Sequence, residues 1–498
     1  MLARTVTEAG RRFGDRTVLV APAGWSLSYA ELDRWSDEAA VGLARAGLTD
    51  GGVLALVLPA CPEYVVLYAA AAKLGAATAG VNHRLTPHER NAVLGVADAD
   101  LVVTTDDLTP GPGLRGGFLS ITPADSVAGA LDRLRVPAAS PPPLAGDDDR
   151  PVAIVFTSGT TGLPKGAVFA GRQIRFICGV DTGAVWADPA APPTHALSAT
   201  SLTHLGPTTK LAGNLHRGGT THLVTRWRAQ DALHLTAEHR MPVLAGIPTQ
   251  LALMLRRPEV DTLDLECVRA IVIGGGPATP ALIREARERF GAALAVRYAC
   301  TEAGIGVGTA FDDPPEDAEE SVGRAHGGVE LTIRDEYGSP VADGGIGDVC
   351  LRSPAVMAGY HRDPTATAAA FWDDGAVRTG DLGFLDDRDR LHLVGRSREM
   401  FVRGGYNVYP MEVEGVLANH PAVVDVVLVP RPDDVMGEVG VAVVVPRDPA
   451  APPTLEDLRA YGAERLARHK LPEDLRVVEA LPLTAMEKVD RDALRRTL

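Results

Sequence analysis

The chain has 498 residues, which is long enough for two or more domains and a sizeable hydrophobic core. Its formal charge of -15, from 49 basic and 64 acidic side chains, argues against nucleic acid or an anionic membrane as the main partner. The apolar stretch 65–81 is interrupted by Lys73 and is rich in Ala and Gly, so we expect no membrane span there.

The five cysteines are scattered along the chain without a C-x-x-C pair, and the N-terminal residues lack the apolar core of a signal peptide. We therefore expect buried free thiols in a reducing, cytoplasmic compartment, and neither a disulfide framework nor a cysteine zinc site.

Helical and strand patterns alternate over about the first 110 residues, which predicts a mostly parallel, doubly wound sheet. Ser28 is a candidate N-cap for a helix over 29–46, and a second helix is predicted over 63–74. Continuous apolar runs predict strands over 53–58, 76–81, 101–104 and 152–156. The Pro- and Asp-rich segment 137–149 is expected to be a loop or internal linker.

The pattern changes along the second half of the chain. A buried strand over 269–273 precedes a helix over 281–290. Between residues 323 and 394, short alternating strands predict a small antiparallel barrel or sheet; they lie at 330–334, 348–352 and 391–394. From about residue 399 a separate α+β unit is expected, with helices over 410–419 and 455–468 and strands over 423–429 and 439–445.

The most informative segment runs from Thr157 to Gly166 and directly follows the predicted strand 152–156. Its glycines can turn successive backbone N–H groups toward one point, and its Ser and Thr hydroxyls add donors. Lys165 supplies a positive charge, so the segment suits an oligophosphate. The alternative, a solvent-exposed Gly/Ser/Thr turn, does not explain the lysine. The order of residues is not that of a Walker loop.

Three further signals lie near predicted strand ends or in turns. Glu302 follows Thr301, and a carboxylate beside a hydroxyl suits Mg²⁺, although a solvated loop acid is the commoner case. Asp381 lies in a glycine-rich turn, where it would either bind ribose hydroxyls or act as the hydrogen-bonding residue of a type I turn. His204 would either line a pocket or be a satisfied core histidine.

Three signals lie in the last part of the chain. Gly404 and Gly405 precede a predicted helix and would either let another molecule pass close to the backbone or form an ordinary helix-entry turn. The charged joint 395–399 separates the barrel-like region from the last unit. Lys488 would by itself be read as a solvated charge.

Taken in order, these motifs resemble the AMP-forming adenylating superfamily, which includes acyl- and aryl-CoA synthetases, peptide-synthetase adenylation domains and luciferases. The resemblance extends from segment 28–32 to Lys488, and the phosphate loop is a full match. Segment 406–414, YNVYPMEVE, is most similar to acyl-CoA synthetases. The implied fold is α/β, with a large N-terminal domain of doubly wound sheets plus a small β-barrel (1–396, barrel about 321–396) and a small mobile α+β domain (397–498).

The resemblance also implies roles for individual residues. ATP would be bound by Thr157, Ser158, Gly159, Thr160, Thr161, Gly162, Lys165, Gly274, Gly275, Gly276, Pro277, Tyr298, Ala299, Cys300, Thr301, Asp381, Leu393 and Arg396. The acyl pocket would include His204, Gly246, Gly274 and Gly304, and the CoA tunnel Gly404, Gly405 and Tyr406. Arg398 would be the hinge and Glu302 the Mg²⁺ ligand. The implied catalytic residues are Lys488, Glu302, Thr301 and His204.

The implied reaction has two halves. A carboxylate attacks the α-phosphate of ATP, with Lys488 stabilising the charge that gathers there, and pyrophosphate leaves. A thiol then attacks the acyl-adenylate and AMP leaves. The small domain is expected to rotate between the halves. The implied partners are a small-molecule carboxylate and either CoA or the phosphopantetheine of a carrier protein. A homodimer is compatible with the sequence, and an aromatic or medium-length acid fits the small, mostly apolar pocket residues.

The chain departs from the family pattern at four positions. Ala299 replaces the glycine of the Tyr-Gly-x-Thr-Glu motif, and Arg398 and Glu399 replace Lys or Asp and Asp while keeping charge. Glu487 replaces the glycine before the catalytic lysine, where a carboxylate could pair with Lys488 and weaken adenylation.

The expected function is that of a carboxylate–CoA ligase, and two alternatives stay open. One is a stand-alone adenylation enzyme that loads a carrier-protein thiol or an amine. The other is a catalytically impaired nucleotide-binding relative, supported mainly by Glu487. An α-amino acid substrate is disfavoured, because the family binds its ammonium with an acid near His204, and residues 201–225 contain no Asp or Glu.

Overall fold

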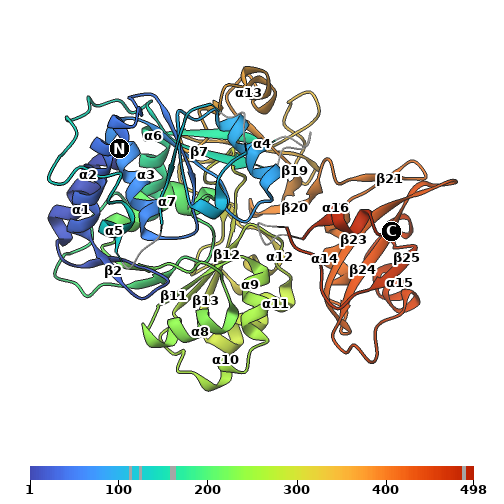
Figure 1. Cartoon of the computed structure of the whole chain (residues 1–498). Helices are drawn as coiled ribbons and strands as arrows, with labels where there is room; N and C mark the ends of the chain where they lie inside the picture. Colours follow the sequence, from blue (N-terminus) through green and yellow to red (C-terminus); the bar gives the residue numbers. More distant parts are fainter. Residues whose placement is uncertain (112–114, 123–125, 158–163, 485–488) are drawn as a thin grey trace.

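In the computed structural model of the chain, the described residues are 1–111, 115–122, 126–157, 164–484 and 489–498. Their strands form five sheets, four in the large N-terminal part and one in a smaller C-terminal unit. Figure 1 shows the C-terminal unit beside the large part, joined to it near β20 and α14.

The largest sheet has the strand order β18-β8-β7-β4-β3-β5-β6, and the strands from β6 to β7 run parallel. Its strands are β3 (Val53–Val57), β4 (Ala77–Gly80), β5 (Leu101–Thr104), β6 (Gly117–Ser120), β7 (Pro151–Thr157), β8 (Lys165–Ala170) and β18 (Gly359–Tyr360). The predicted strands 53–58, 76–81, 101–104 and 152–156 are confirmed within a residue or two. β8 and β18 add an antiparallel edge.

Helices cover both faces of this sheet, which is the doubly wound arrangement predicted from the alternation. Along β3, Leu54 and Leu56 point into a core shared with α1, α2, α3 and α7, whereas Ala55 and Val57 point into a core shared with α4. The helices are α1 (Leu2–Phe13), α2 (Tyr29–Arg45), α3 (Pro62–Leu74), α4 (Pro87–Ala97), α5 (Val127–Ala130), α6 (Gly171–Thr182) and α7 (Leu205–His216), with a 3₁₀ turn at Asp106–Leu108.

Polar side chains start α2 and tie it to α3. Ser28 caps α2 in a capping box with Glu31, as predicted: the Ser28 hydroxyl accepts from the Glu31 N–H, and the Glu31 carboxylate accepts from the Ser28 N–H. Lys73, which interrupts the apolar stretch, is buried and lies 2.6 Å from both Asp33 and Asp37 of α2. Among the described helices, none combines the length and the hydropathy that a bilayer crossing needs.

Two further sheets follow in the large part. A four-stranded sheet has the order β2-β1-β10-β9, from β1 (Thr17–Val20), β2 (Ser26–Ser28), β9 (His195–Leu197) and β10 (Thr220–His222). A five-stranded sheet contains β11 (Val243–Gly246), β12 (Ala270–Gly274), β13 (Ala293–Tyr298), β14 (Val307–Gly308) and β15 (Arg324–Ala325). Its first three strands run parallel. The helices packed on it are α8 (Ala229–Glu238), α9 (Pro248–Leu255), α10 (Glu259–Thr262), α11 (Pro280–Phe290) and α12 (Pro315–Glu320).

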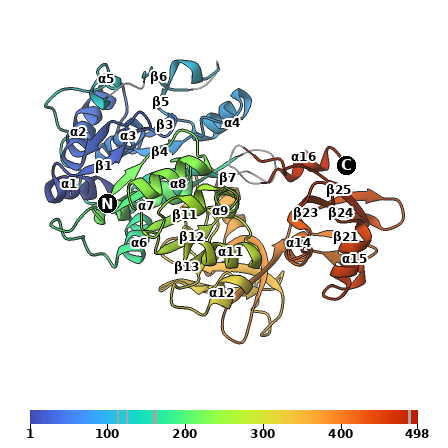
Figure 2. The ribbon, with the colours of Figure 1, turned by 90° about the horizontal axis from the view of Figure 1, so that it is seen from below.

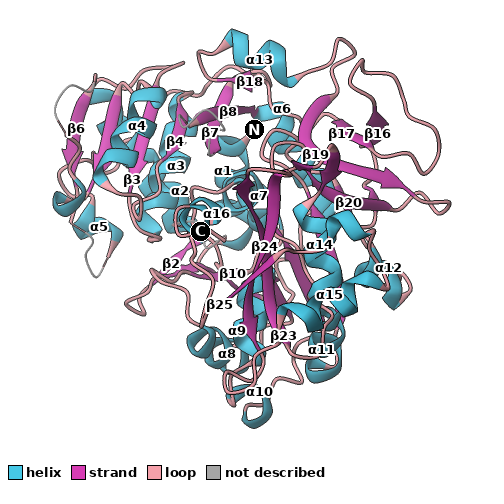
Figure 3. Cartoon of the chain, turned by 90° about the vertical axis from the view of Figure 1, so that its right-hand side faces the viewer, coloured by secondary structure: helices cyan, strands magenta, loops and turns pink. Residues whose placement is uncertain are grey.

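The region predicted to be a small barrel or sheet is a four-stranded antiparallel sheet (Figure 3). Its strands are β16 (Glu330–Arg334), β17 (Gly347–Arg352), β19 (Val377–Leu385) and β20 (Leu391–Arg396), and α13 (Pro364–Ala370) precedes β19. Val349, Val377 and Leu391 form its buried core.

The C-terminal unit is an α+β sandwich of one sheet and three helices. Its elements are β21 (Phe401–Arg403), β22 (Tyr406–Val408), α14 (Pro410–Leu417), β23 (Val423–Asp433), β24 (Gly437–Pro446), α15 (Leu455–Ala463), a 3₁₀ turn at Arg468–Lys470, β25 (Asp474–Val477) and α16 (Arg491–Arg495). Alternate residues of β23 face opposite cores: Val426 faces α14 and α15, whereas Val427 faces α16. The unit therefore has its own hydrophobic core.

One predicted helix is too long. The pattern predicts a helix over 455–468, but α15 ends at Ala463. The chain turns there because Leu466 and Leu471 both fold back into the core that holds Leu458. A Cβ on Gly462 would lie 2.9 Å from Cδ2 of Leu471, so Leu471 packs closely against this position.

Candidate active site

The carboxyl ends of three parallel strands meet at one edge of the five-stranded sheet. In register, Gly246 of β11 pairs with Ile273, and Gly274 of β12 pairs with Arg297 of β13. Tyr298 ends β13, and Thr301 and Glu302 follow it after two residues. Because ligands of open α/β sheets bind outside such strand ends, this edge is the candidate nucleotide site. The structure thus brings together predicted residues from three separate motifs.

The glycines on this edge differ in the space around them. Gly275 and Gly276 are exposed, and a Cβ on either would be 3.6 Å or more from its neighbours Ile247 and Pro248. A Cβ on Gly274 would instead lie 2.6 Å from the Arg297 carbonyl oxygen of the neighbouring strand. Gly274 is therefore required by strand packing, whereas the exposed surface at Gly275 and Gly276 has room for a Cβ.

Two glycines predicted for the acyl pocket are in close contact with their neighbours. Gly304 has φ +72°, and its Cβ would lie 2.3 Å from the Ala355 carbonyl oxygen. A Cβ on Gly246 would lie 2.5 Å from Oε1 of Gln250. His204, which is also predicted for the acyl pocket, is half-buried at the N-cap of α7.

Asp381 is the best-anchored carboxylate at this edge. Tyr298 donates from its hydroxyl to Asp381 Oδ2 at 2.7 Å, and Arg396 Nε lies 3.0 Å from Asp381 Oδ1. Asp381 and Arg396 are cross-strand partners on β19 and β20, so the Tyr298 bond ties the five-stranded sheet to the antiparallel sheet. Each carboxylate oxygen keeps a second lone pair, which can accept a ribose hydroxyl. Leu393, also predicted, lies half-buried on β20 opposite Gly383.

Burial shifts the pKa values around Asp381. Asp381 is only 5% exposed, and burial raises the pKa of its carboxyl, against the opposing effects of the Arg396 charge and the Tyr298 hydrogen bond. Burial, followed by the charges of Glu302 and Asp381, also raises the pKa of the Cys300 thiol. The thiolate, which is the nucleophilic form of cysteine, is therefore disfavoured at Cys300.

Glu302 and Lys165 share a tyrosine that the motif analysis missed. Tyr360 donates from its hydroxyl to Glu302 Oε1 at 2.7 Å, and Lys165 Nζ lies 5.1 Å from the centroid of the Tyr360 ring. The Glu302 carbonyl also accepts from the Met357 N–H at 2.9 Å. Tyr360 reaches this position because β18 pairs with β8, which Lys165 begins. No sequence spacing signals so short a strand.

Several predicted residues lie outside the described residues. They are Ser158, Gly159, Thr160, Thr161 and Gly162 of the phosphate loop, together with Glu487 and Lys488. The residues that flank these segments are described. Thr157 and Lys165 are antiparallel partners, as are Leu483 and Val489.

The predicted CoA-tunnel residues form a tight hairpin in the C-terminal unit. Gly404 and Gly405, with φ +55° and +86°, connect Arg403 and Tyr406, which are cross-strand partners. The Tyr406 ring stacks on His469 with centroids 4.6 Å apart. A pocket beside this hairpin is lined by Arg403, Tyr406, Arg459, Arg468, His469 and Glu473. In both views β21 lies on the outer part of the C-terminal unit, away from β7 (Figures 1 and 2).

The predicted hinge, Arg398, is exposed in the turn between β20 and β21. Its neighbour Glu399 lies 3.5 Å from the Nε of Arg491, which also pairs with Glu414 of α14 at 2.7 Å. Arg491 follows Lys488 by three residues, so the C-terminal segment is tied to the joint and to α14 by one arginine.

These elements define an adenylate-forming type of enzyme. The chain has two parts, the ends of parallel strands form a candidate nucleotide site, and the carboxylates of Asp381 and Glu302 lie beside it. The chain belongs to the AMP-binding enzyme family. It matches the family's AMP-binding enzyme model over residues 6–361 and the AMP-binding enzyme C-terminal domain model over residues 412–488.

Individual relatives cover nearly the whole chain. It is 30% identical to a fatty acid–[acyl-carrier-protein] ligase of Streptomyces coeruleorubidus, across 96% of this chain and 93% of that protein. It is also 30% identical to a feruloyl-CoA synthase of an Amycolatopsis species, across 97% and 96%. ATP-bound MatB from Rhodopseudomonas palustris has a similar structure, with a TM-score of 0.87, 28% identity and coverage of 100% and 99%.

Proposed function

We propose that the protein is an AMP-forming acid–CoA ligase, which activates a carboxylic acid with ATP and transfers the acyl group to CoA. The observation that carries this proposal is that Asp381, Glu302 and Lys165 gather beside the end of β13, where Tyr298 holds Asp381 and Tyr360 lies between Glu302 and Lys165. A ribose anchor, a cation-binding acid and a phosphate-binding lysine at one strand edge suit ATP better than any other common ligand.

In the first half of the proposed reaction, Asp381 orients the ribose and Lys165 neutralises the phosphates. Thr301 contacts the α-phosphate, which the substrate carboxylate attacks. Lys488 neutralises the negative charge that the transition state gathers on the α-phosphate oxygens. A bond forms between a carboxylate oxygen and the α-phosphorus, and the bond from the α-phosphorus to the oxygen that bridges it to the β-phosphorus breaks. Pyrophosphate leaves with that oxygen, and the carboxylate becomes an acyl-adenylate.

Glu302 is the proposed Mg²⁺ ligand. Its half-buried carboxylate, with the hydroxyl of Thr301 beside it, offers the oxygen donors that a hard cation prefers. Tyr360 fixes Oε1 of this carboxylate from the side of Lys165. When bound, Mg²⁺ would neutralise charge on the phosphates of ATP.

For the second half, we propose that residues 397–498 rotate about Arg398 relative to residues 1–396. Since the Gly404–Gly405 hairpin lies away from the strand edge, this motion is what would bring it to the adenylate. The hairpin is then the path for the pantetheine thiol. Arg459 and Arg468 beside it offer positive charge for the phosphates of CoA, and the Tyr406 ring stacks on His469.

The acceptor separates this proposal from its main alternative, in which the acyl group goes to the phosphopantetheine of a carrier protein. The acyl-carrier-protein ligase among the relatives favours that alternative, and the feruloyl-CoA synthase favours CoA. The basic pocket supports CoA, because free CoA carries a nucleotide with phosphates of its own. Both relatives also support a fatty or aromatic acid as substrate.

The test is a screen of fatty and aromatic acids for ATP-dependent pyrophosphate release, followed by addition of CoA. The proposal requires AMP and an acyl-CoA to form together. An adenylate that persists in CoA but transfers to a carrier protein would reject CoA as the acceptor. The absence of pyrophosphate release with every acid would favour the catalytically impaired relative.

A variant tests the division of labour between the two halves. We expect Lys488→Ala to abolish adenylate formation while thioester formation from a synthetic acyl-adenylate continues at a rate close to that of the wild type. Equal loss of both activities would show that Lys488 does not act in the first half alone.

A further inference from the structure

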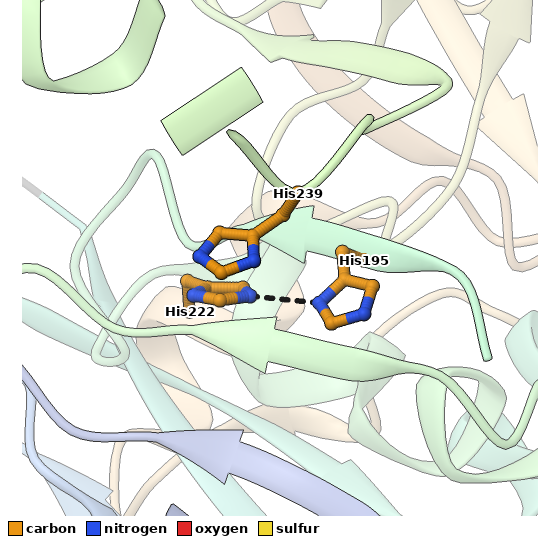
Figure 4. A group of neighbouring side chains, drawn as sticks. All are labelled: His195, His222 and His239. Atoms are coloured by element: carbon orange, nitrogen blue, oxygen red, sulfur yellow. Dashed lines mark hydrogen bonds between the residues drawn. The ribbon is translucent and has the colours of Figure 1, made fainter. Parts of the chain in front are cut away.

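Three histidine rings gather at the junction of two sheets. His195, His222 and His239 each offer a ring nitrogen, and these nitrogens all lie within 4.8 Å of one another. His195 Nδ1 and His222 Nε2 are 2.9 Å apart and share a hydrogen bond (Figure 4). The rings of His222 and His239 have centroids 4.1 Å apart. The proposed reaction uses none of the three.

The fold builds this group from rigid elements. His195 begins β9 and is the register partner of Thr220, so it lies on the same face of the sheet as His222, two residues further along β10. His239 is the C-cap of α8, and its backbone N–H donates to the Leu235 carbonyl. Two neighbouring parallel strands and the end of a helix therefore hold the rings, which is the kind of support that fixes a ligand set.

We propose that His195, His222 and His239 bind one divalent transition-metal ion, with Zn²⁺ as the best-suited cation. Three imidazole nitrogens suit Zn²⁺, Cu²⁺, Ni²⁺ or Co²⁺, whereas Mg²⁺ prefers oxygen ligands and stays at Glu302. The proposed site is thus chemically distinct from the site of the reaction's own cation.

The geometry is close to that of a metal site and needs only small adjustments. In a tetrahedral site with Zn–N bonds of about 2.0–2.1 Å, ligand nitrogens lie roughly 3.4 Å apart. The observed upper limit of 4.8 Å therefore requires ring movements of about 1 Å, and the 2.9 Å pair opens slightly.

The partial exposure of His239 leaves one side of the group accessible. His222 is 3% exposed, whereas the side chain of His239 is 29% exposed. Glu238 extends from the same turn, with its Oε1 3.8 Å from His239 Nε2. A water molecule or this carboxylate would complete the coordination, so a cation can enter from the His239 side.

The ion would link β9 and β10 to the end of α8, and residues next to its ligands belong to two different hydrophobic cores. Leu223, next to His222, belongs to the core of the large sheet, whereas Leu197, on the same strand as His195, packs against the core of α8 and β11–β13. In addition, the Ser198 N–H donates to the His222 carbonyl, and the Ala199 carbonyl accepts from Gln250 beside Gly246. A bound ion would therefore stabilise the two sheets that meet behind the proposed acyl pocket.

The alternative is that the three rings form a neutral, hydrogen-bonded packing group. The test uses the full-length protein without a histidine tag, stripped with a chelator and then titrated with ZnCl₂ by calorimetry. Excess MgCl₂ is present throughout to occupy oxygen sites. The proposal expects one Zn²⁺ per chain and an increase of the melting temperature on Zn²⁺ addition.

His239→Ala and His222→Ala are the test variants, and His234→Ala is the matched control, because His234 is exposed on the same helix, α8. We expect each test variant to weaken Zn²⁺ binding at least about tenfold and to lose the thermal shift, while the control keeps both. His239→Ala keeps the test informative if loss of the buried His222 prevents folding.

Two results would overturn the proposal. One is wild-type protein that takes up no stoichiometric Zn²⁺. The other is Zn²⁺ uptake that His239→Ala and the His234→Ala control change equally, which would assign the ion to scattered surface side chains. A visible absorption spectrum gives a second measurement. Co²⁺ bound in this site would produce absorption bands that are lost in His239→Ala.

Discussion

Tyr360→Phe offers a sharp test of the nucleotide edge, because it removes one atom. The ring stays in place, so the contact with Lys165 is kept, and the hydrogen bond to Glu302 Oε1 is lost. If Tyr360 positions the carboxylate that binds Mg²⁺, adenylation should slow, and higher Mg²⁺ should recover part of the loss. Binding of CoA should not change.

The size of the effect follows from the charge of the acceptor. A hydrogen bond to a charged group contributes about 1.5–3 kcal/mol, and each 1.36 kcal/mol is a factor of ten in rate. The full range is therefore roughly 10- to 150-fold in kcat/KM for ATP. Glu302 is half-buried and water can replace the lost donor, so we expect a loss of about tenfold, at the lower end.

The assay is pyrophosphate release at several Mg²⁺ concentrations, with Tyr337→Phe as control because Tyr337 is 81% exposed. The reasoning fails if Tyr360→Phe adenylates at the wild-type rate at every Mg²⁺ concentration. It also fails if the variant slows only the transfer to CoA, since Tyr360 and Glu302 would then have no role at the phosphates of ATP.

Three other predictions concern separate parts of the chain. Arg396→Gln removes the charge that opposes the raised pKa of Asp381, so the acid limb of kcat/KM for ATP should move to higher pH; a limb that stays in place would show that Asp381 does not titrate there. Arg468→Ala should raise the KM for CoA several-fold and leave pyrophosphate release unchanged, whereas an unchanged KM would remove the basic pocket from the CoA path. Ser28→Ala breaks the capping box of α2 and should lower the free energy of unfolding by about 1 kcal/mol in urea denaturation, with Ser26→Ala as control.

Features that depend on local pattern could be predicted from the sequence. The largely apolar run 101–104 predicts its strand to the residue, because a strand buried on both faces contains few polar positions. The cap at Ser28 was predictable because its partner Glu31 lies one turn away. Asp381 and Tyr298 were each identified by a motif, and the structure adds the bond between them.

Features that depend on register between distant segments could not be predicted. Tyr360 reaches Glu302 only because a two-residue strand pairs with β8, and two residues carry no periodic signal. The histidines at 195, 222 and 239 are separated by 27 and 17 residues, far from the short spacings typical of metal motifs. Parallel pairing of β9 with β10 brings the first two together, and the end of α8 adds the third.

The unequal space around the glycines of the nucleotide edge bears on how such an enzyme can diversify. At Gly274 and Gly304 a side chain would collide with a backbone carbonyl, so a substitution at either position would disturb the fold. Gly275 has φ +80° and is also unfavourable for other residues. Gly276 has an ordinary backbone conformation, and a Cβ there would be 3.8 Å from Pro248. Among these four positions, Gly276 is therefore where a single substitution can change the shape of the edge without a collision with the backbone.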